Sequence, residues 1–215
     1  MTAVDTGPTH RERKKQATRR AINAAAVDLV ESQGLSGATI EAISELAGVA
    51  PRTFWSYFSS KEEAVLDLDP ERPERLRQAL LARPETEDAL TAIQRVLESD
   101  LAGRITDRSH AVRIGNIVRA EPELRGAVAA IYDRVEQALV SAVGERVGQN
   151  PDRELYPGLL VGAACAITRV ALWRWTGLPG RPGLQTLLDD AFRQLSAGLA
   201  EPLRKPAPIA RGSRR

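Results

Sequence analysis

Apolar residues recur at spacings of three and four along most of the chain, which is the period of an amphipathic helix. Runs of Val, Ile and Thr that alternate with polar residues, as half-buried β-strands do, are missing. The pattern therefore predicts an all-α fold, with short helices near the N-terminus and longer helices after them.

The first two predicted helices begin at residues that favour helix caps. Thr9 can cap a helix that ends at Gly34, and Thr39 can cap a short one that ends at Gly48. The first helix has one apolar face, which we expect to be buried and which comprises Ile22, Ala25, Ala26, Leu29 and Val30.

Two more short helices are predicted before the pattern lengthens. Pro51 suits the first turn of a helix, because the missing N–H has no partner there in any case, and we expect this helix to continue through Phe58. Ser60 and Glu63 form the pattern of a capping box, which predicts a fourth helix.

Longer helices are predicted over residues 74–82, 86–102, 109–120, 122–147, 153–176 and 184–199. The helix at 153–176 is apolar nearly all round, so it should be buried on several sides. The predicted organisation is a disordered N-terminus (1–8), a small helical domain (9–62), a larger helical domain (63–200) and a disordered basic tail (201–215).

The composition is that of a soluble protein: 43% of the 215 residues are hydrophobic and 27% are charged. The first 20 residues lack the apolar core of a signal peptide, and the longest apolar run, residues 159–167, is short for a membrane span. Cys165 is the single cysteine, which fits a reducing compartment. We therefore expect a cytoplasmic protein with no membrane partner.

Basic residues are concentrated at the two ends of the chain. Residues 1–20 contain six Lys or Arg against two acidic residues, and residues 201–215 contain five against one. Residues 62–200 contain 17 basic and 21 acidic side chains. Basic ends on an acidic body indicate contact with a polyanion, although solvated tails would give the same count.

Residues 39–58 have the build of a helix-turn-helix, a motif whose second helix enters the major groove of DNA. Gly48 suits the turn between the two short helices, and Val49 can fill the angle between them. Phe54 and Phe58, four residues apart, would hold the second helix to a small core. A plain structural α-hairpin is the alternative, but it gives no reason for exposed aromatic and basic side chains.

The opposite side of the second helix supplies the candidate DNA contacts. Arg52 can donate two hydrogen bonds to guanine, which would specify sequence. The other candidates would position the protein on phosphates or on base edges. The complete set is Arg20, Thr39, Pro51, Arg52, Thr53, Trp55, Ser56, Tyr57 and Lys61.

The run from Gly48 to Glu63, together with Arg20 to Gly34, Thr39 and Ile43, resembles the signature of the TetR family of bacterial transcriptional regulators. The resemblance implies a three-helix DNA-binding domain, a larger ligand-binding domain, and a homodimer that binds a palindromic operator. Two residues depart from the family pattern. Ala50 replaces a capping Ser or Thr, and Arg52 replaces a common Gly, which points to a base preference particular to this protein.

The larger domain resembles the family's ligand-binding domains less specifically. The stretches from Arg119 to Leu124 and from Ala171 to Trp175 are similar to a subgroup described as having an acyl-CoA-like ligand domain. By the same resemblance, the helices at 153–176 and 184–199 would form a four-helix bundle with their counterparts in a second subunit.

Six residues are candidates for contact with a small hydrophobic ligand. For Ile117 and Trp173 a purely structural role in the core is the alternative, and Arg169 could equally find a structural partner. Cys165 also fits a small buried hydrophobe, since a redox sensor would need an activated thiol. The candidates are Arg113, Ile117, Tyr132, Cys165, Arg169 and Trp173.

The sequence contains no P-loop, dinucleotide-binding glycine turn, nucleophile elbow or zinc-binding histidine pair, so we expect no enzyme activity, metal or cofactor. The predicted function is a sequence-specific DNA-binding regulator, a repressor that a small hydrophobic ligand releases from DNA. A helical carrier of hydrophobic ligands, or an interaction module, is the alternative for the larger domain.

Overall fold

The structure is a computed structural model that describes residues 10–105, 107–177 and 183–199. The predicted disordered segments, 1–8 and 201–215, lie outside the described residues, as does the expected cap Thr9. Every regular element within the described ranges is a helix, which confirms the all-α prediction.

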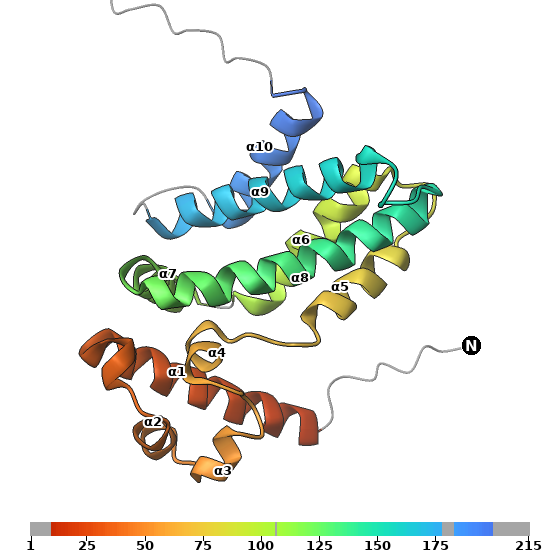
Figure 1. Ribbon diagram of the computed structural model, residues 1–215. Coiled ribbons are helices and arrows are strands. Elements are labelled where there is room, and N and C mark those ends of the chain that lie inside the picture. Colours follow the sequence, from red (N-terminus) through yellow and green to blue (C-terminus); the bar gives the residue numbers. More distant parts are fainter. Residues whose placement is uncertain (1–9, 106, 178–182, 200–215) are drawn as a thin grey trace, which may run out of the picture.

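The helices follow one another in two groups (Figure 1). The N-terminal group is α1 (His10–Gly37), α2 (Ile40–Leu46), α3 (Pro51–Phe54) and α4 (Lys61–Leu66). The second group is α5 (Arg72–Leu81), α6 (Ala89–Arg104), α7 (Arg108–Ala120), α8 (Pro122–Val147), α9 (Leu155–Gly177) and α10 (Leu184–Ser196). The N-terminal group forms one end of the molecule and α10 lies at the other (Figure 1).

α1 is interrupted where the sequence predicts its end. Gly34 has φ 74° and ψ 168°, values that a side chain with a Cβ would not tolerate, and a last turn continues to Gly37. The N–H of Leu35, just after this break, donates to Glu121 Oε1 at 3.1 Å. The break therefore places the end of α1 against the junction of α7 and α8.

α3 is shorter than predicted, because it stops at Phe54 instead of Phe58. The N–H groups of Ser56 and Tyr57 donate to carbonyls three residues back, at 3.0 and 2.9 Å, so the chain tightens into turns. The sequence pattern alone does not distinguish a tightened turn from a continued helix.

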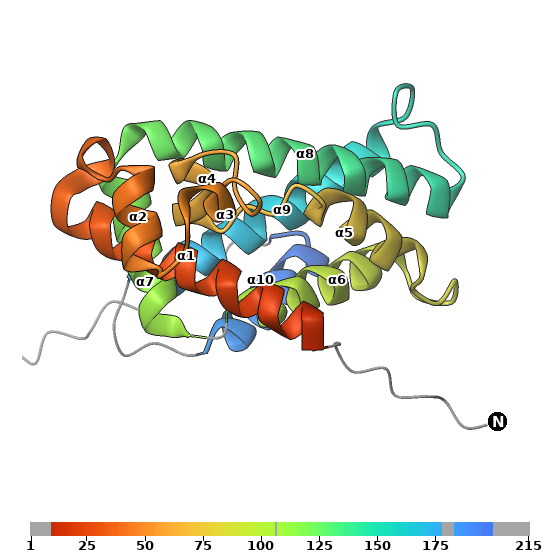
Figure 2. The same cartoon turned by 90° about the horizontal axis from the view of Figure 1, so that it is seen from below.

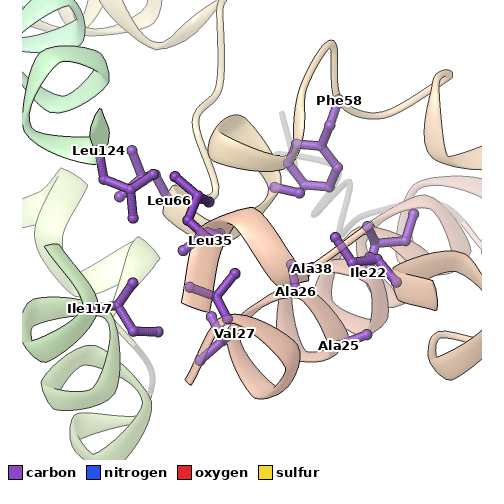
Figure 3. Packing of buried hydrophobic residues seen from close by; sticks show 14 of the residues in the cluster. Ile22, Ala25, Ala26, Val27, Leu35, Ala38, Phe58, Leu66, Ile117 and Leu124 are labelled. Carbon is purple, nitrogen blue, oxygen red and sulfur yellow. The ribbon is translucent and has the colours of Figure 1, made fainter. Parts of the chain in front are cut away.

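The N-terminal helices and part of the larger domain share one hydrophobic core. Ile22, Val27 and Phe54 are fully buried in it. Ile117 of α7 and Leu124 of α8 belong to the same cluster and point toward α1 and α4 (Figure 3). The DNA-binding candidate is thus packed directly on the larger domain.

A second core lies among α5, α6, α8, α9 and α10. Its fully buried members include Leu80, Ile93, Leu139 and Val161. α8 is the long helix common to both cores, and it runs across the molecule from the N-terminal group to the far end (Figure 2). Both ends of α8 agree with the sequence, since Pro122 starts it and Gly148, at φ 70°, caps it.

Candidate DNA-binding surface and ligand cavity

Two buried phenylalanines fix the orientation of α3. Phe54 has no exposed surface and Phe58 only 2%, and their ring centroids lie 6.0 Å apart. Trp55 meets Phe54 edge-on at 5.5 Å yet remains 54% exposed. With the phenylalanines directed inward, the side chains between them face solvent.

The exposed side of α3 and of the turn that follows it contains most of the predicted DNA contacts. Pro51, Arg52, Trp55 and Ser56 are exposed, and Thr53 and Tyr57 are half-buried. Arg52 is exposed, and the Ser56 hydroxyl donates to the Arg52 backbone carbonyl at 3.2 Å. A guanidinium in such a position can form two parallel hydrogen bonds with guanine.

Thr39 caps α2 as predicted, because its hydroxyl accepts the N–H of Ala42 at 3.2 Å. Ser60 caps α4 in the same way by accepting the N–H of Glu63 at 3.1 Å. Ala50 provides no side-chain cap for α3, which starts at Pro51 instead. The two short helices beside α3 are therefore capped through side chains, whereas α3 depends on packing.

Lys61 has a structural role that sequence reasoning missed. Its ammonium donates to the carbonyls of Leu35 and Ala38, at 2.6 and 3.2 Å, and so joins the start of α4 to the end of α1. No local pattern points to these acceptors, because they lie 26 and 23 residues away in the chain.

Arg19 of α1 is a second residue that sequence reasoning missed. Its guanidinium donates to Asp67 Oδ1 at 2.7 Å, to the Leu68 carbonyl at 2.6 Å and to the Tyr57 carbonyl at 3.2 Å. It also lies 4.3 Å from the centre of the Phe58 ring. Arg19 thus connects the end of the α3 turn to the residues that follow α4.

A cavity of about 910 Å³ lies between the N-terminal helices and the larger domain. Its walls come from α1, the segment after α4, and the helices α5 to α9, and they include Arg19, Arg20 and Asn23 of α1. The volume falls within the range of ligand pockets, roughly 300–1,000 Å³. Tyr132 and Trp173, two of the predicted ligand contacts, line it.

The other four predicted ligand contacts do not line this cavity. Arg113 instead pairs with Asp28 and Glu31 of α1, at 2.5 and 2.7 Å. Ile117 is buried in the core shared by the two domains. Cys165 packs against the second core, and Arg169 is exposed on α9. Helical periodicity shows which residues share a face of α7 or α9, but not which of those faces lines the cavity.

Arg20, a predicted DNA contact, is exposed and also lines the cavity. The same helix, α1, therefore contributes both to the basic N-terminal surface and to the cavity wall. Sequence reasoning assigned these two features to separate domains.

A hydrogen bond crosses the cavity wall between the two domains. His110 Nε2 of α7 lies 2.7 Å from Asn23 Oδ1 of α1. The Asn23 amide nitrogen donates to the carbonyls of Ala64 and Val65, at 2.7 and 3.0 Å. Its oxygen is then the acceptor, so His110 is the donor through Nε2. Asn23 thereby joins α1, α4 and α7 at one point.

One face of α9 is apolar and exposed. Leu159 is 64% exposed, Val170 56% and Trp173 62%. On its other sides α9 packs against α6, α7, α8 and α10, so the expected burial on several sides is found except on this face. By length and mean hydropathy α9 could also cross a membrane, but one such helix has little weight, because core helices of soluble proteins pass the same test.

Comparison with known proteins assigns both parts of the chain. Residues 22–68 match the family model described as "Bacterial regulatory proteins, tetR family", and residues 85–200 match the model described as "MftR C-terminal domain". The HTH-type transcriptional regulator TcmR from Streptomyces glaucescens is 30% identical over 177 residues, which cover 79% of this chain and 77% of that protein.

Solved structures share the fold at lower identity. NalD, the secondary repressor of the MexAB-OprM multidrug efflux pump in Pseudomonas aeruginosa, has a TM-score of 0.58 at 20% identity, covering 85% of this chain and 97% of that one. FadR from Bacillus subtilis, solved with stearoyl-CoA, has a TM-score of 0.53 at 21% identity, covering 83% and 98%. The family models and the similarity to TcmR together establish that this chain belongs to the TetR family of transcriptional regulators.

Proposed function

We propose that the protein is a repressor that binds a palindromic operator through α3 of two subunits and leaves it when a small ligand occupies the cavity. The observation that supports DNA reading most directly is the exposure of Arg52 on α3 and of Trp55 and Ser56 in the turn after it, beside buried Phe54 and Phe58. We assign base reading to Arg52, and contacts with base edges or phosphates to the remaining predicted residues.

We propose that Thr39 and Lys61 contact phosphates beside α3. Thr39, Trp55 and Lys61 border one shallow hollow on the surface next to the recognition helix. Because the Lys61 ammonium already donates to two carbonyls, its contribution to DNA affinity would be electrostatic as well as structural. Arg20 would add to the basic surface of α1.

The exposed apolar face of α9 favours a homodimer. Leu155, Leu159 and Val170 would leave water if α9 and α10 packed against the same helices of a second subunit. Such a dimer must place its two α3 helices about 34–36 Å apart, or a multiple of that, to reach successive major grooves. Sedimentation analysis of a Leu159→Glu variant should give monomers if this face is the interface.

The interdomain cavity is the proposed ligand site. A ligand there would contact α1 directly, so it could change the orientation of the N-terminal helices relative to α7 and α8. To shift the protein from 1:99 to 99:1 in favour of the released state, the ligand must prefer that state by about 5.5 kcal/mol. An acyl-CoA-like ligand is one candidate, because the structurally similar FadR was solved with stearoyl-CoA.

The alternative of a helical carrier explains the cavity but gives no role to the exposed side chains of α3. Selection of bound DNA from a random duplex pool, at two salt concentrations, tests the difference. A palindromic motif retained at the higher salt would support the regulator. Weak binding without a motif, abolished by salt, would contradict it, because phosphate contacts alone give non-specific and salt-sensitive binding. We propose no catalytic step for this protein, and a cytoplasmic location.

A further inference from the structure

Two guanidinium groups in the cavity wall share a single carboxylate. Arg72 of α5 and Asp100 of α6 form a buried pair, with side chains only 8% and 7% exposed. Arg72 donates to both carboxylate oxygens, at distances of 2.8–3.3 Å. Arg104, one turn after Asp100, approaches the same carboxylate only to 3.9 Å, beyond hydrogen-bonding distance. Asp100 is thus hydrogen-bonded to Arg72 and forms only a longer ion pair with Arg104.

A second carboxylate in the cavity wall, that of Asp67, is bonded to another arginine. Asp67 accepts a hydrogen bond from Arg19 at 2.7 Å, and Arg19, Asp67 and Arg104 all line the cavity. In the part of the chain that the structure describes, the Arg104 side chain has no hydrogen-bond acceptor. Burial, and then the neighbouring Arg72, lower the pKa of Arg104 from its usual value, and the carboxylates of Asp100 and Asp67 offset this only in part.

Apolar side chains from α7, α8 and α9 also line the cavity. They are Ile114, Val118, Val128, Ile131 and Leu172, and Tyr132 of α8 lies among them. Of the charged residues in the described lining, six are arginines and three are aspartates. The cavity therefore combines an apolar surface with an excess of cations.

We propose that the ligand of this cavity is an amphipathic anion, with a carboxylate or phosphate bound to Arg104 and an apolar body against α7, α8 and α9. The inference rests on the proposed function of the cavity as the ligand site. An anion at Arg104 would supply the acceptor that Asp100 and Asp67 do not. The apolar body would displace water from the remaining walls.

Calorimetric titration with three matched probes tests the inference on the full-length protein. Dodecanoate and dodecyl phosphate contain the anionic group, whereas 1-dodecanol has the same chain without a charge. We expect either anion to bind at least about tenfold more tightly than the alcohol, since charge-assisted hydrogen bonds are the stronger ones. The affinity of the anion should also fall as salt rises, while that of the alcohol stays constant.

Arg104→Met removes the charge with little loss of length. It should lower anion affinity about tenfold and leave 1-dodecanol within about twofold. Arg95→Met is the matched control, because Arg95 lies on the same helix, is 57% exposed and does not line the cavity. Arg104→Lys should restore part of the anion affinity. If Arg104→Met does not fold, the affinities of the unaltered protein for the anions and for 1-dodecanol still test whether the cavity prefers an anion.

Equal affinity of acid and alcohol, equal losses of both in Arg104→Met, or no binding of either anion would overturn the inference. Operator binding without ligand distinguishes this failure from failure of the proposed function. A protein that binds its operator and is released by a neutral ligand would remain a regulator but would contradict the anion site. Binding of anions through Arg104 without DNA release would retain the site and contradict regulation.

Discussion

Arg19→Leu is the substitution that most directly tests how the recognition helix is held. The Arg19 side chain is 23% exposed and that of Asp67 41%, so each of its three hydrogen bonds should contribute about 1 kcal/mol rather than the 1.5–3 of a fully buried charged pair. The contact with Phe58 adds about 0.5–1 kcal/mol. We therefore expect Arg19→Leu to lower the free energy of unfolding by about 3.5–4 kcal/mol.

Urea unfolding followed by far-ultraviolet circular dichroism measures this loss, at a fixed protein concentration because a dimer's stability depends on it. Arg13→Leu is the control, since Arg13 lies on the same helix and is exposed. Arg19→Lys, which keeps the charge but loses the fork of donors, should fall between the two. A loss below about 0.5 kcal/mol in Arg19→Leu would refute the assignment of Arg19 as the residue that holds the α3 turn, because that is the level of an ordinary surface substitution.

Three further predictions concern the DNA surface and the cysteine. Arg52→Ala should relax sequence preference at one base position by about 1–3 kcal/mol in a competition binding assay; an equal loss on all sequences would contradict base reading. Lys61→Ala should weaken binding to every DNA sequence, reduce the slope of log affinity against log salt concentration by about 1, and lower the melting temperature. An unchanged slope would show that Lys61 contacts no phosphate. Burial raises the pKa of the Cys165 thiol to about 11. Alkylation of Cys165 by iodoacetamide should therefore be very slow at pH 7 and become faster up to about pH 11, because only the thiolate reacts. Rapid alkylation at pH 7 would contradict the buried environment.

The sequence was sufficient to predict the helices and the helix-turn-helix, because their signals are local. Caps at Thr39 and Ser60, Pro122 and Gly148 at the ends of α8, and the buried pair Phe54 and Phe58 all follow from residues a few positions apart. The early end of α3 was missed because tightened turns and helix share the same spacing.

The ligand cavity could not be predicted in the same way. It is enclosed by residues far apart in the chain, such as Asn23 and His110, which are 87 residues apart and whose contact no periodicity indicates. Arg113, a predicted ligand contact, pairs with Asp28 and Glu31 of α1, which are more than 80 residues away in the chain. Tyr132 and Trp173 were predicted as ligand contacts, but Arg72 and Arg104, which line the same cavity, were not.

The position of the cavity between the two domains constrains how the protein can diverge. Arg19, Arg20 and Asn23 line it from α1, so a mutation there that suits a new ligand also alters the helix that supports the DNA-binding surface. The walls from α7 and α8 are coupled to α1 as well, because Ile114, Val128 and Ile131 belong to or pack against the core that they share with it. The wall from α9, with Leu172 and Thr176, lies outside that core. Among relatives descended from a common ancestor, ligand preference should therefore drift through the α9 wall, while the α1 side changes only together with the operator.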